Sequence, residues 1–389
     1  MDEVRNPFAP GAGTRPPQLA GRQDLLKASD VALQRLLQGR AARGLILTGL
    51  RGTGKTVLLN TLERRADALD FETAFIEAPE TANLEALLFP KLRQAMTRFS
   101  TVEAARSIAH RGLKTLRSFA SVFKLEHEGI TLSVDPEAGS ADSGNLELDL
   151  TDVFLRLGEA AQAAGRGWAL CLDEIQYLSQ RELAALIVAL HRCTQRNLPV
   201  ILFGAGLPQI AALSGNAKSY AERLFDFRTI GPLDARASRQ ALADPIAEEG
   251  ETITDEAIDG IYDRTQGYAY FLQEWGYQCW NTAETSPISA DVVEAATPLA
   301  FARLDDSFFR VRFDRLTPAE RDYVRAMAGL GSGPYRSGDV AAALSRTAGS
   351  LAPTRASIIR KGMIYSPSHG NIDFTVPMFD GFLARMNVG

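Results

Sequence analysis

The chain has 389 residues, of which 46% are hydrophobic, and its formal net charge is −5. A chain of this length exceeds one ordinary hydrophobic core, so we expect two or three domains. The acidic balance excludes a protein that is basic over its whole surface, although it leaves room for a local basic patch. The three cysteines are scattered along the chain, so neither a disulfide framework nor a zinc site is indicated.

The first 20 residues are rich in proline and glycine and predict a flexible arm. Residues 1–17 include Asp2 and Glu3 and lack the apolar centre of a signal peptide. No stretch of the sequence reaches the roughly 18 apolar residues that a membrane-spanning helix needs. We therefore expect a soluble, cytoplasmic protein without a membrane partner.

Residues 49–56 read Gly-Leu-Arg-Gly-Thr-Gly-Lys-Thr and fit the P-loop pattern Gly-x-x-x-x-Gly-Lys-Thr. The apolar run over 44–48 predicts a strand before the loop, and residues 57–62 predict a helix after it. Backbone N–H groups of such a loop converge on phosphate oxygens, and the helix N-terminus adds partial positive charge. We expect Lys55 to reach the β- and γ-phosphates of ATP or ADP and Thr56 to ligate Mg²⁺. The residues predicted to bind the nucleotide are Gly49, Leu50, Arg51, Gly52, Thr53, Gly54, Lys55, Thr56 and Val57.

A second strand is predicted over 71–77 and a helix over 84–99, and an unusual charge distribution follows. Residues 91–124 carry eight Lys and Arg against one acid, whereas residues 125–155 carry eight acids and no Lys or Arg. Residues 122–134 alternate like a hairpin, and 136–145 resemble a loop. We interpret about 91–150 as an insertion. Its basic part is either a solvated helix facing the acidic part or a docking surface for nucleic acid or protein.

The apolar residues 168–172 predict a third strand that leads directly into Asp173 and Glu174. This order fits the second phosphate-site motif of P-loop ATPases. Asp173 would hold Mg²⁺ through water or through Thr56, and Glu174 would orient and polarise the attacking water. A further parallel strand is predicted over 198–203.

Residues 234–304 lack strand signals and predict a lid of four helices, near 235–248, 255–265, 267–280 and 289–304. The last segment begins with Thr317-Pro318-Ala319-Glu320, a capping box with proline at the first helical position. Two more helices, at 337–344 and 353–361, and a hairpin over 363–376 predict a winged helix–turn–helix. Residues 315–389 carry nine Arg and Lys against five acids, and the helix at 353–361 has no acid.

Together these pieces resemble the AAA+ P-loop ATPases, nearest to the branch of the origin-recognition initiators and the signal-transducing ATPases with numerous domains. The resemblance rests on Pro-x-Leu-x-Gly-Arg at 17–22, the P-loop, Asp173-Glu174, Gly-Tyr-x-Tyr-Phe-Leu-Gln at 267–273 and the C-terminal helices and hairpin. The sequence is also similar to actinobacterial and phage-associated proteins known only as ATP-binding or initiator-like.

The resemblance implies an α/β fold in which a parallel P-loop NTPase sheet is followed by a helical lid and a C-terminal winged helix–turn–helix. The implied domains are a flexible arm (1–20), an ATPase domain with the insertion (21–232), a lid (233–310) and a winged helix (311–389). The segment at 17–22 contacts adenine in that family, so Leu19, Gly21 and Arg22 are candidates for the base.

The resemblance also exposes departures from the family pattern. The strand tip that usually carries a polar sensor has Gly204 and Ala205, so a backbone group, Gln176 or Gln195 would have to substitute. No arginine occurs over 267–280, where a lid arginine usually touches the γ-phosphate. Both departures predict a slow switch.

Arg223 lies where such families place an arginine that senses the nucleotide or completes a neighbouring active site, which would require a homo-oligomer. The alternative is a surface ion pair with Glu222 or Asp226. The predicted catalytic residues are therefore Lys55, Glu174 and Arg223, with Thr56 and Asp173 at the metal.

Two functions follow from these observations. The first is an ATP-binding, slowly hydrolysing switch that couples nucleotide state to duplex DNA through Arg355, Arg360 and Lys361. The second is a regulatory ATPase whose winged helix gates the nucleotide or binds a protein partner without touching DNA. A kinase is disfavoured, because Glu174 follows Asp173 where water activation is required and no acceptor-substrate motif is visible.

Overall fold

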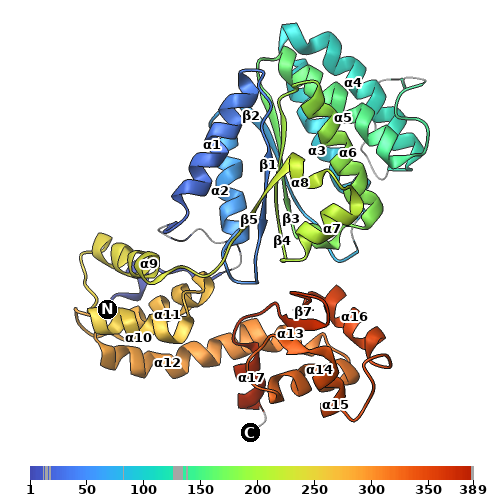
Figure 1. Ribbon diagram of the computed structural model, residues 1–389. Coiled ribbons are helices and arrows are strands. Elements are labelled where there is room, and N and C mark those ends of the chain that lie inside the picture. Colours follow the sequence, from blue (N-terminus) through green and yellow to red (C-terminus); the bar gives the residue numbers. More distant parts are fainter. Residues whose placement is uncertain are drawn as a thin grey trace.

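The structure is a computed structural model that describes residues 1–11, 13, 16, 19–81, 83–125, 135–136 and 139–386. These residues form an α/β domain, a helical domain and a C-terminal domain. The helical domain and the C-terminal domain lie next to each other below the α/β domain in Figure 1. None of the helices in the described part of the chain is long and apolar enough to cross a membrane.

Five parallel strands form the sheet of the α/β domain, in the order β2-β3-β4-β1-β5. Every residue of β1, β3 and β4 is buried, as expected for a parallel sheet covered on both faces. The P-loop strand and the following helix are therefore present as predicted. The strand bounds are Gly44–Thr48 (β1), Phe71–Glu77 (β2), Gly167–Asp173 (β3), Val200–Gly206 (β4) and Phe225–Thr229 (β5).

Two layers of helices cover this sheet (Figure 1). Alternate side chains of β1 point to opposite faces: Leu45 and Leu47 pack with α1 and α2, whereas Ile46 packs with α3, α5 and α6. α4 packs outside on α3 and α5, and the short α7 and α8 precede β5. The helices are α1 (Gln23–Leu37), α2 (Lys55–Asp67), α3 (Leu84–Ser100), α4 (Glu103–Val122), α5 (Leu146–Ala163), α6 (Gln180–Gln195), α7 (Ile210–Ala217) and α8 (Ala221–Leu224).

The hairpin predicted over 122–134 is wrong at its start. Val122 is the last residue of α4, and the Leu125 amide closes the helix by donating to the Ala120 carbonyl at 2.9 Å. At this helix end Phe119 packs against Phe123, the residue after Val122, with ring centroids 4.7 Å apart. Residues 126–134 of the predicted hairpin lie outside the described residues.

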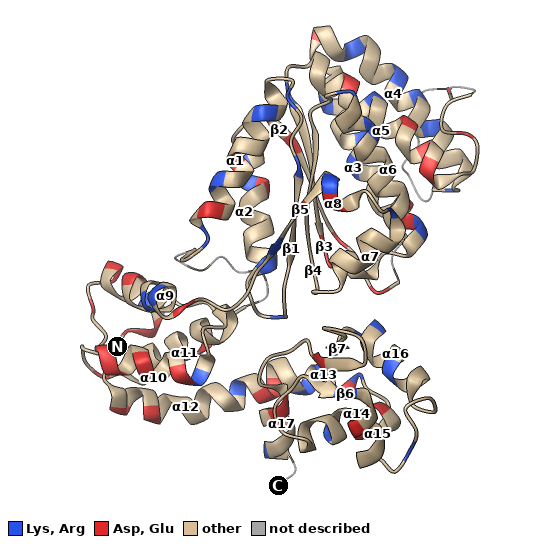
Figure 2. Ribbon diagram, in the orientation of Figure 1, with Lys and Arg blue, Asp and Glu red and all other residues tan. Residues whose placement is uncertain are grey.

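The charges of the insertion are partly neutralised within the α/β domain. Arg98 of the insertion pairs with the buried carboxylate of Glu72 on β2 at 2.6 Å, and Arg166, outside the insertion, pairs with the same carboxylate at 2.7 Å. Asp149 of α5 accepts hydrogen bonds from the Ser143 and Gly144 amides of its own loop, so this acid holds the loop. Basic residues also lie along α4 (Figure 2), where Arg106 pairs with Glu103 of the same helix at 2.7 Å. The net positive charge of the surface over residues 91–124 is therefore smaller than the count of Lys and Arg in the sequence indicates.

Four helices form the lid region as predicted, and the N-terminal segment packs against them. The lid helices are α9 (Ala235–Glu248), α10 (Asp255–Thr265), α11 (Ala269–Thr282) and α12 (Ala290–Leu304). The prediction of a flexible arm fails for its first residues: Phe8 is only 2% exposed, and Asn6 Nδ2 donates to the Tyr277 carbonyl at 3.1 Å. Gly276 admits the Phe8 ring, because a Cβ there would lie 2.7 Å from it.

The C-terminal domain contains the predicted helices and hairpin, with an added short strand. Its antiparallel sheet has the order β6-β8-β7, and the Thr317 amide donates to Glu320 Oε2 at 2.7 Å in the predicted capping box. A single hydrophobic cluster joins the lid to this domain, with Phe309 stacked on Phe382 at 5.3 Å. The elements are a π-helical turn (Asp305–Arg310), α13 (Val311–Asp314), α14 (Pro318–Gly329), β6 (Tyr335–Arg336), α15 (Ser337–Ala343), α16 (Ala352–Arg360), β7 (Ile364–Tyr365), β8 (Asn371–Phe374) and α17 (Phe379–Met386).

Candidate nucleotide site

A cavity of about 480 Å³ lies at the carboxyl edge of the sheet, where the P-loop and the end of β3 meet. Residues 51–58, Asp173 and Glu174 line it on the α/β side, and Tyr270, Phe308 and Arg312 line it from the lid and the segment beyond. Its size falls in the range of small-molecule sites. Ligands of open α/β sheets bind at this edge, because the loops that follow the parallel strands gather there.

The P-loop backbone needs glycine at several places. Gly52 and Gly54 have φ angles of 80° and 88°, in the left-handed region that glycine adopts without strain. Gly54 caps α2, which begins at Lys55. At Gly49 a Cβ would lie 2.2 Å from the Ile230 carbonyl oxygen, so only glycine fits there. Gly49 and Leu50 shape the loop without lining the cavity.

Lys55 lies at the bottom of the cavity, where it is 9% exposed and its Nζ donates to the Leu50 carbonyl at 2.7 Å. Burial lowers the pKa of Lys55 to about 8, although the nearby carboxylates of Glu174 and Asp173 act in the opposite direction. A lysine in this position can place its charge beside a phosphate.

Thr56 and Asp173 meet across the cavity, with the Thr56 hydroxyl donating to Asp173 Oδ2 at 2.6 Å. Burial raises the pKa of Asp173, which is 3% exposed. Hydroxyl and carboxylate oxygens suit Mg²⁺. The described residues contain no cluster of three or more His, Cys, Asp or Glu that could hold a metal. The hydroxyl of Thr56 and the carboxylate of Asp173 supply two oxygens, which fits a Mg²⁺ ion that phosphates and water would complete, as is usual for this ion.

Glu174 follows Asp173 with a φ angle of 54°, unusual for a residue other than glycine. Arg51 Nη1 pairs with its Oε1 at 3.1 Å, and Gln176 Nε2 donates to its Oε2. Gln176 in turn accepts a hydrogen bond from the Leu207 amide at 3.1 Å, just beyond β4. The carboxylate thus lines the cavity and is held between the P-loop and the tip of β4.

β4 continues to Gly206, so Gly204 and Ala205 lie inside the strand and not at its tip, as the sequence analysis had placed them. A Cβ on Gly204 would lie 2.3 Å from Ile175 Cδ1 and 2.7 Å from Ile46 Cδ1, so a side chain there would have to displace both isoleucines. Of the side chains predicted to substitute for the missing sensor, Gln176 lies at this tip. Gln195 is the last residue of α6, at the other end of the sheet, and it accepts a hydrogen bond from Arg192 at 2.9 Å.

Arg312 is the cavity residue that the sequence analysis missed. It lies in α13, beyond the lid, with its guanidinium carbon 4.1 Å from the centroid of the Phe308 ring. Burial, reinforced by the charge of Arg51, lowers the pKa of Arg312 to about 10. The lid itself closes on the P-loop through the Tyr270 amide, which donates to the Gly52 carbonyl at 3.0 Å. No motif marked Arg312, because only tertiary packing brings it to the P-loop.

Of the three residues predicted to contact the base, two line the cavity and one does not. Leu19 and Arg22 line the cavity, and Arg22 Nη2 donates to the Gly231 carbonyl at 2.6 Å. Gly21 does not line it; with a φ angle of 67° it turns the chain toward α1.

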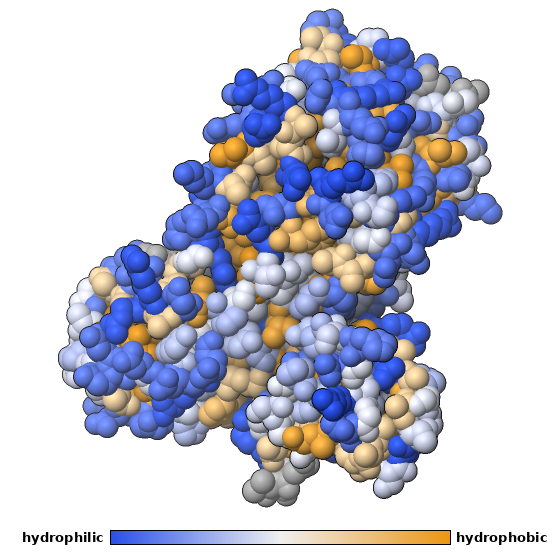
Figure 3. Space-filling model, viewed as in Figure 1, coloured by the Kyte–Doolittle hydropathy of each residue, from blue (hydrophilic) through white to orange (hydrophobic). Residues whose placement is uncertain are grey.

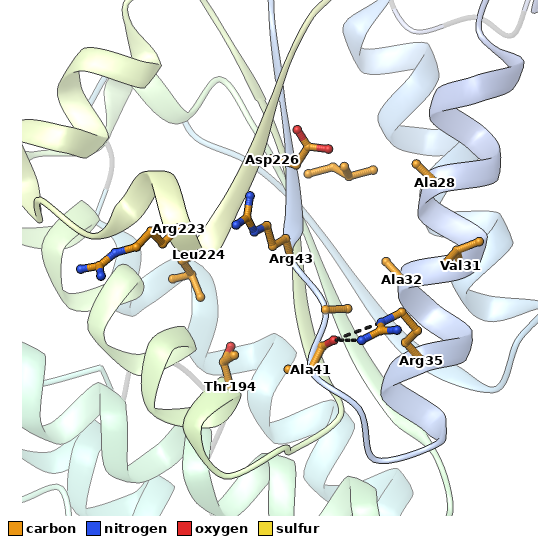
Figure 4. Close-up of a pocket in the computed structure, with 12 residues that line it drawn as sticks. Ala28, Val31, Ala32, Arg35, Ala41, Arg43, Thr194, Arg223, Leu224 and Asp226 are labelled. Carbon is orange, nitrogen blue, oxygen red and sulfur yellow. Dashed lines mark hydrogen bonds between the residues drawn. The ribbon is translucent and has the colours of Figure 1, made fainter.

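Arg223 lies away from this site, on the rim of a second, open cavity of about 570 Å³ (Figure 4). It precedes Phe225, which pairs with Gly44 at the amino edge of the sheet, whereas the P-loop follows the carboxyl end of β1. Among the described residues, Arg223 forms neither of the predicted ion pairs, with Glu222 or with Asp226; the carboxylate of Asp226 pairs instead with Arg228 Nη2 at 2.7 Å. Arg223 is therefore exposed and separate from the nucleotide site of its own chain.

Comparisons with known proteins agree with this geometry. Residues 18–203 match the family model described as the AAA ATPase domain, and residues 306–383 match one described as a domain of unknown function (DUF8462). The fold is similar to that of the Walker-type ATPase PABY2304 of Pyrococcus abyssi, with a TM-score of 0.58 and 15% identity over 95% of this chain and 97% of that chain. Residues 18–203 are thus similar to the AAA ATPase domain, and the parallel sheet with its P-loop has a P-loop NTPase fold.

Two further solved structures are less similar, with TM-scores below 0.5. The Thermotoga maritima RuvB Holliday junction branch migration motor has a TM-score of 0.47 and 16% identity, over 93% of this chain and 95% of that chain. The Aeropyrum pernix ORC1 protein in complex with DNA has a TM-score of 0.46 and 15% identity, over 95% and 94%. No curated protein matches the sequence at a significant level.

The pKa of Lys55 leads to a prediction about pH. Phosphate binding favours the protonated lysine, so above its pKa of about 8 each binding event must take up a proton. We expect the affinity for Mg²⁺-ADP to fall about tenfold between pH 7 and pH 9. Equilibrium titrations at several pH values measure this. Lys55→Arg is the control, since arginine stays charged over this range. An equal fall in both proteins would contradict the assignment.

Proposed function

We propose that this protein is an ATP-driven switch in which the C-terminal domain is the output of the nucleotide site. One observation carries the proposal: the C-terminal region takes part in the nucleotide cavity. Arg312 lines the cavity, and the Arg51 amide of the P-loop donates to the Thr375 carbonyl at 2.8 Å. A change of ligand at the P-loop therefore changes contacts with the output domain directly. The proposed domains are 21–232, 233–310 and 311–389.

The chemistry assigned to the site is ATP hydrolysis. Lys55 would bind the β- and γ-phosphates, and Thr56 and Asp173 would hold Mg²⁺, which neutralises charge on the phosphate oxygens. Glu174 would orient the attacking water. Two features support slow turnover: the last residues of β4, Gly204, Ala205 and Gly206, offer no polar side chain, and both carboxylate oxygens of Glu174 already accept hydrogen bonds.

Duplex DNA is the first proposed target of the C-terminal domain. Its helices α14, α15 and α16 and its β7–β8 hairpin have the order of a winged helix–turn–helix. Basic residues lie on α16 (Figure 2), where Arg360 is exposed and Arg355 is half-buried. Lys361 has another role, because its Nζ donates to Glu320 Oε2 at 2.6 Å. Although burial of Glu320 acts in the opposite direction, hydrogen bonds from Lys361 and Ser357 hold its pKa at about 2.

A second candidate function is a regulatory ATPase whose C-terminal domain gates the nucleotide or binds a protein partner. The contacts of Arg51 with this domain favour the regulatory function. They join a residue of the P-loop to the carbonyl groups of Gly362, after α16, and Thr375, after β8. DNA binding separates the two functions, since gating alone requires none.

The first test concerns catalysis. We expect Glu174→Gln to keep ATP binding and to lower hydrolysis about a hundredfold, since the amide cannot act as a base. Phosphate release and binding of a fluorescent ATP analogue measure the two quantities. Lys55→Ala is the contrasting variant, in which binding itself should weaken. Undiminished turnover in Glu174→Gln would show that another residue positions the water.

The second test concerns DNA. We expect duplex affinity to fall with salt, and Arg360→Ala to reduce the slope of log affinity against log salt by about 0.9, because one fewer phosphate is then neutralised. Lys361→Ala is the matched control on the next residue, and its slope should stay unchanged because Glu320 already binds that ammonium group. Absence of duplex binding at low salt would leave the regulatory function.

Arg223 is proposed to act on the nucleotide site of a second copy. β5 and β1 run parallel over five paired residues, which separates Arg223 from the P-loop edge of its own chain by about 16 Å. Between α1 and α8 the surface is apolar and edged with hydrophilic groups (Figure 3), and Val31 there is 48% exposed.

The third test follows from this placement. Lys55→Ala and Arg223→Ala chains should each have low activity, and mixing them should restore part of it, because an intact arginine then meets an intact P-loop. Turnover of the mixture, compared with each variant alone, measures the effect. If mixing restores nothing, Arg223 does not complete a neighbouring site.

A further inference from the structure

Arg51 is the point at which the nucleotide site, the carboxylate assigned to orient water and the C-terminal domain meet. Its guanidinium pairs with Glu174 at 3.1 Å and donates to the Tyr177 hydroxyl at 3.1 Å. The same group donates from Nε to the Gly362 carbonyl at 3.4 Å. Its backbone amide donates to the Thr375 carbonyl at 2.8 Å. One P-loop residue therefore contacts both Glu174 and two backbone groups of the C-terminal domain.

These contacts determine where the Glu174 carboxylate points. Oε1 is held by Arg51 and Oε2 by Gln176, and the side chain is only 22% exposed. A carboxylate can orient a water only through an oxygen that reaches the water's proton. Arg51 and Gln176 therefore fix the direction in which the remaining lone pairs of the carboxylate point, and Arg51 is the partner whose position depends on another domain.

The C-terminal side of the contact is rigid. Thr375 is completely buried, its hydroxyl donates to the Gly362 carbonyl at 2.5 Å, and its amide donates to the Met363 carbonyl at 3.0 Å. These bonds tie the turn after α16 to the end of β8, so the two carbonyls that face Arg51 move together. Across the same interface, Arg315 forms an ion pair with Glu80.

The turn after α16 allows Arg51 to come close to the backbone because it contains Gly362. Gly362 has a φ angle of 64°, and a Cβ there would lie 2.8 Å from Arg51 Nη2 and 3.2 Å from the Tyr177 hydroxyl. Any side chain at this position would push the guanidinium away. The close contact between Arg51 and the C-terminal domain therefore depends on a single glycine.

We propose that Arg51 is a positioning residue through which the C-terminal domain restrains Glu174. While the carbonyls of Gly362 and Thr375 hold Arg51, the guanidinium keeps the carboxylate away from the attacking water and hydrolysis is slow. Displacement of the C-terminal domain frees Arg51 and, with it, Glu174. This inference rests on the proposed ATPase function and specifies how the output domain controls it. By linkage, ATP at the P-loop and a partner on the C-terminal domain then influence each other's binding.

The test compares two glycine variants of the full chain. Gly362→Ala removes the close contact, whereas Gly370→Ala is the matched control: its φ angle is 79°, and a Cβ there meets nothing within 4 Å. Both variants carry a similar backbone strain. We expect Gly362→Ala to raise kcat for ATP hydrolysis about fivefold or more with little change in KM. Gly370→Ala should match the wild type. A lower or equal kcat in Gly362→Ala would overturn the proposal.

A charge exchange at the interface keeps the proposal testable if Gly362→Ala does not fold. Arg315→Glu alone should place two carboxylates together and raise kcat, and Arg315→Glu combined with Glu80→Arg should return it toward the wild-type value. Equal rates in the wild type, the single variant and the double variant would overturn the restraint.

Binding of a fluorescent ATP analogue to the same proteins distinguishes failure of the proposed restraint from failure of the proposed ATPase function. Normal binding with unchanged rates overturns the restraint and leaves the proposed function in place. Absence of binding in the wild type overturns both.

Discussion

In the proposed switch, the ion pair between Arg51 and Glu174 is the interaction on which the coupling between domains depends. It exists because a parallel sheet brings the loop after β1 and the end of β3 to one edge. The lid then closes on the same loop through Tyr270 and Gly52, and the C-terminal domain closes on it through Thr375 and Arg51. Each domain contributes to the surroundings of the phosphates, so a ligand there affects the energy of both interfaces.

The sequence alone was sufficient to predict the P-loop, the strand that ends at Asp173 and the capping box at Thr317. The P-loop needs glycines with left-handed backbone, a lysine and a threonine in a fixed order, and the apolar strand before Asp173 places that carboxylate opposite Thr56. The capping box at Thr317 likewise involves residues only three positions apart. The P-loop and the capping box depend on neighbours in the chain, so their patterns are recognisable without a structure. The contact between Thr56 and Asp173 joins residues 117 positions apart, but each of the two lies in a recognisable local pattern.

The features that sequence reasoning missed depend on contacts between distant segments. Arg312 reaches the cavity only because the segment after the lid packs beside the P-loop, and Phe8 is buried because Gly276 leaves space for its ring. Counts of basic residues also mislead, since Arg98 and Lys361 are bound by the buried carboxylates of Glu72 and Glu320. Pairing of this kind is decided by tertiary packing, which charge patterns along the chain do not contain.

The central claim is that the nucleotide at the P-loop changes the position of the C-terminal domain. The most direct measurement is the distance between spin labels on exposed residues of the two domains, at Lys27→Cys in α1 and Ala342→Cys in α15. The native cysteines, Cys171, Cys193 and Cys279, are all buried, which favours selective labelling. The account predicts that a non-hydrolysable ATP analogue with Mg²⁺ shifts the distance distribution relative to Mg²⁺-ADP, and that Arg51→Ala removes the difference. Identical distributions with both nucleotides in the otherwise native chain would contradict it.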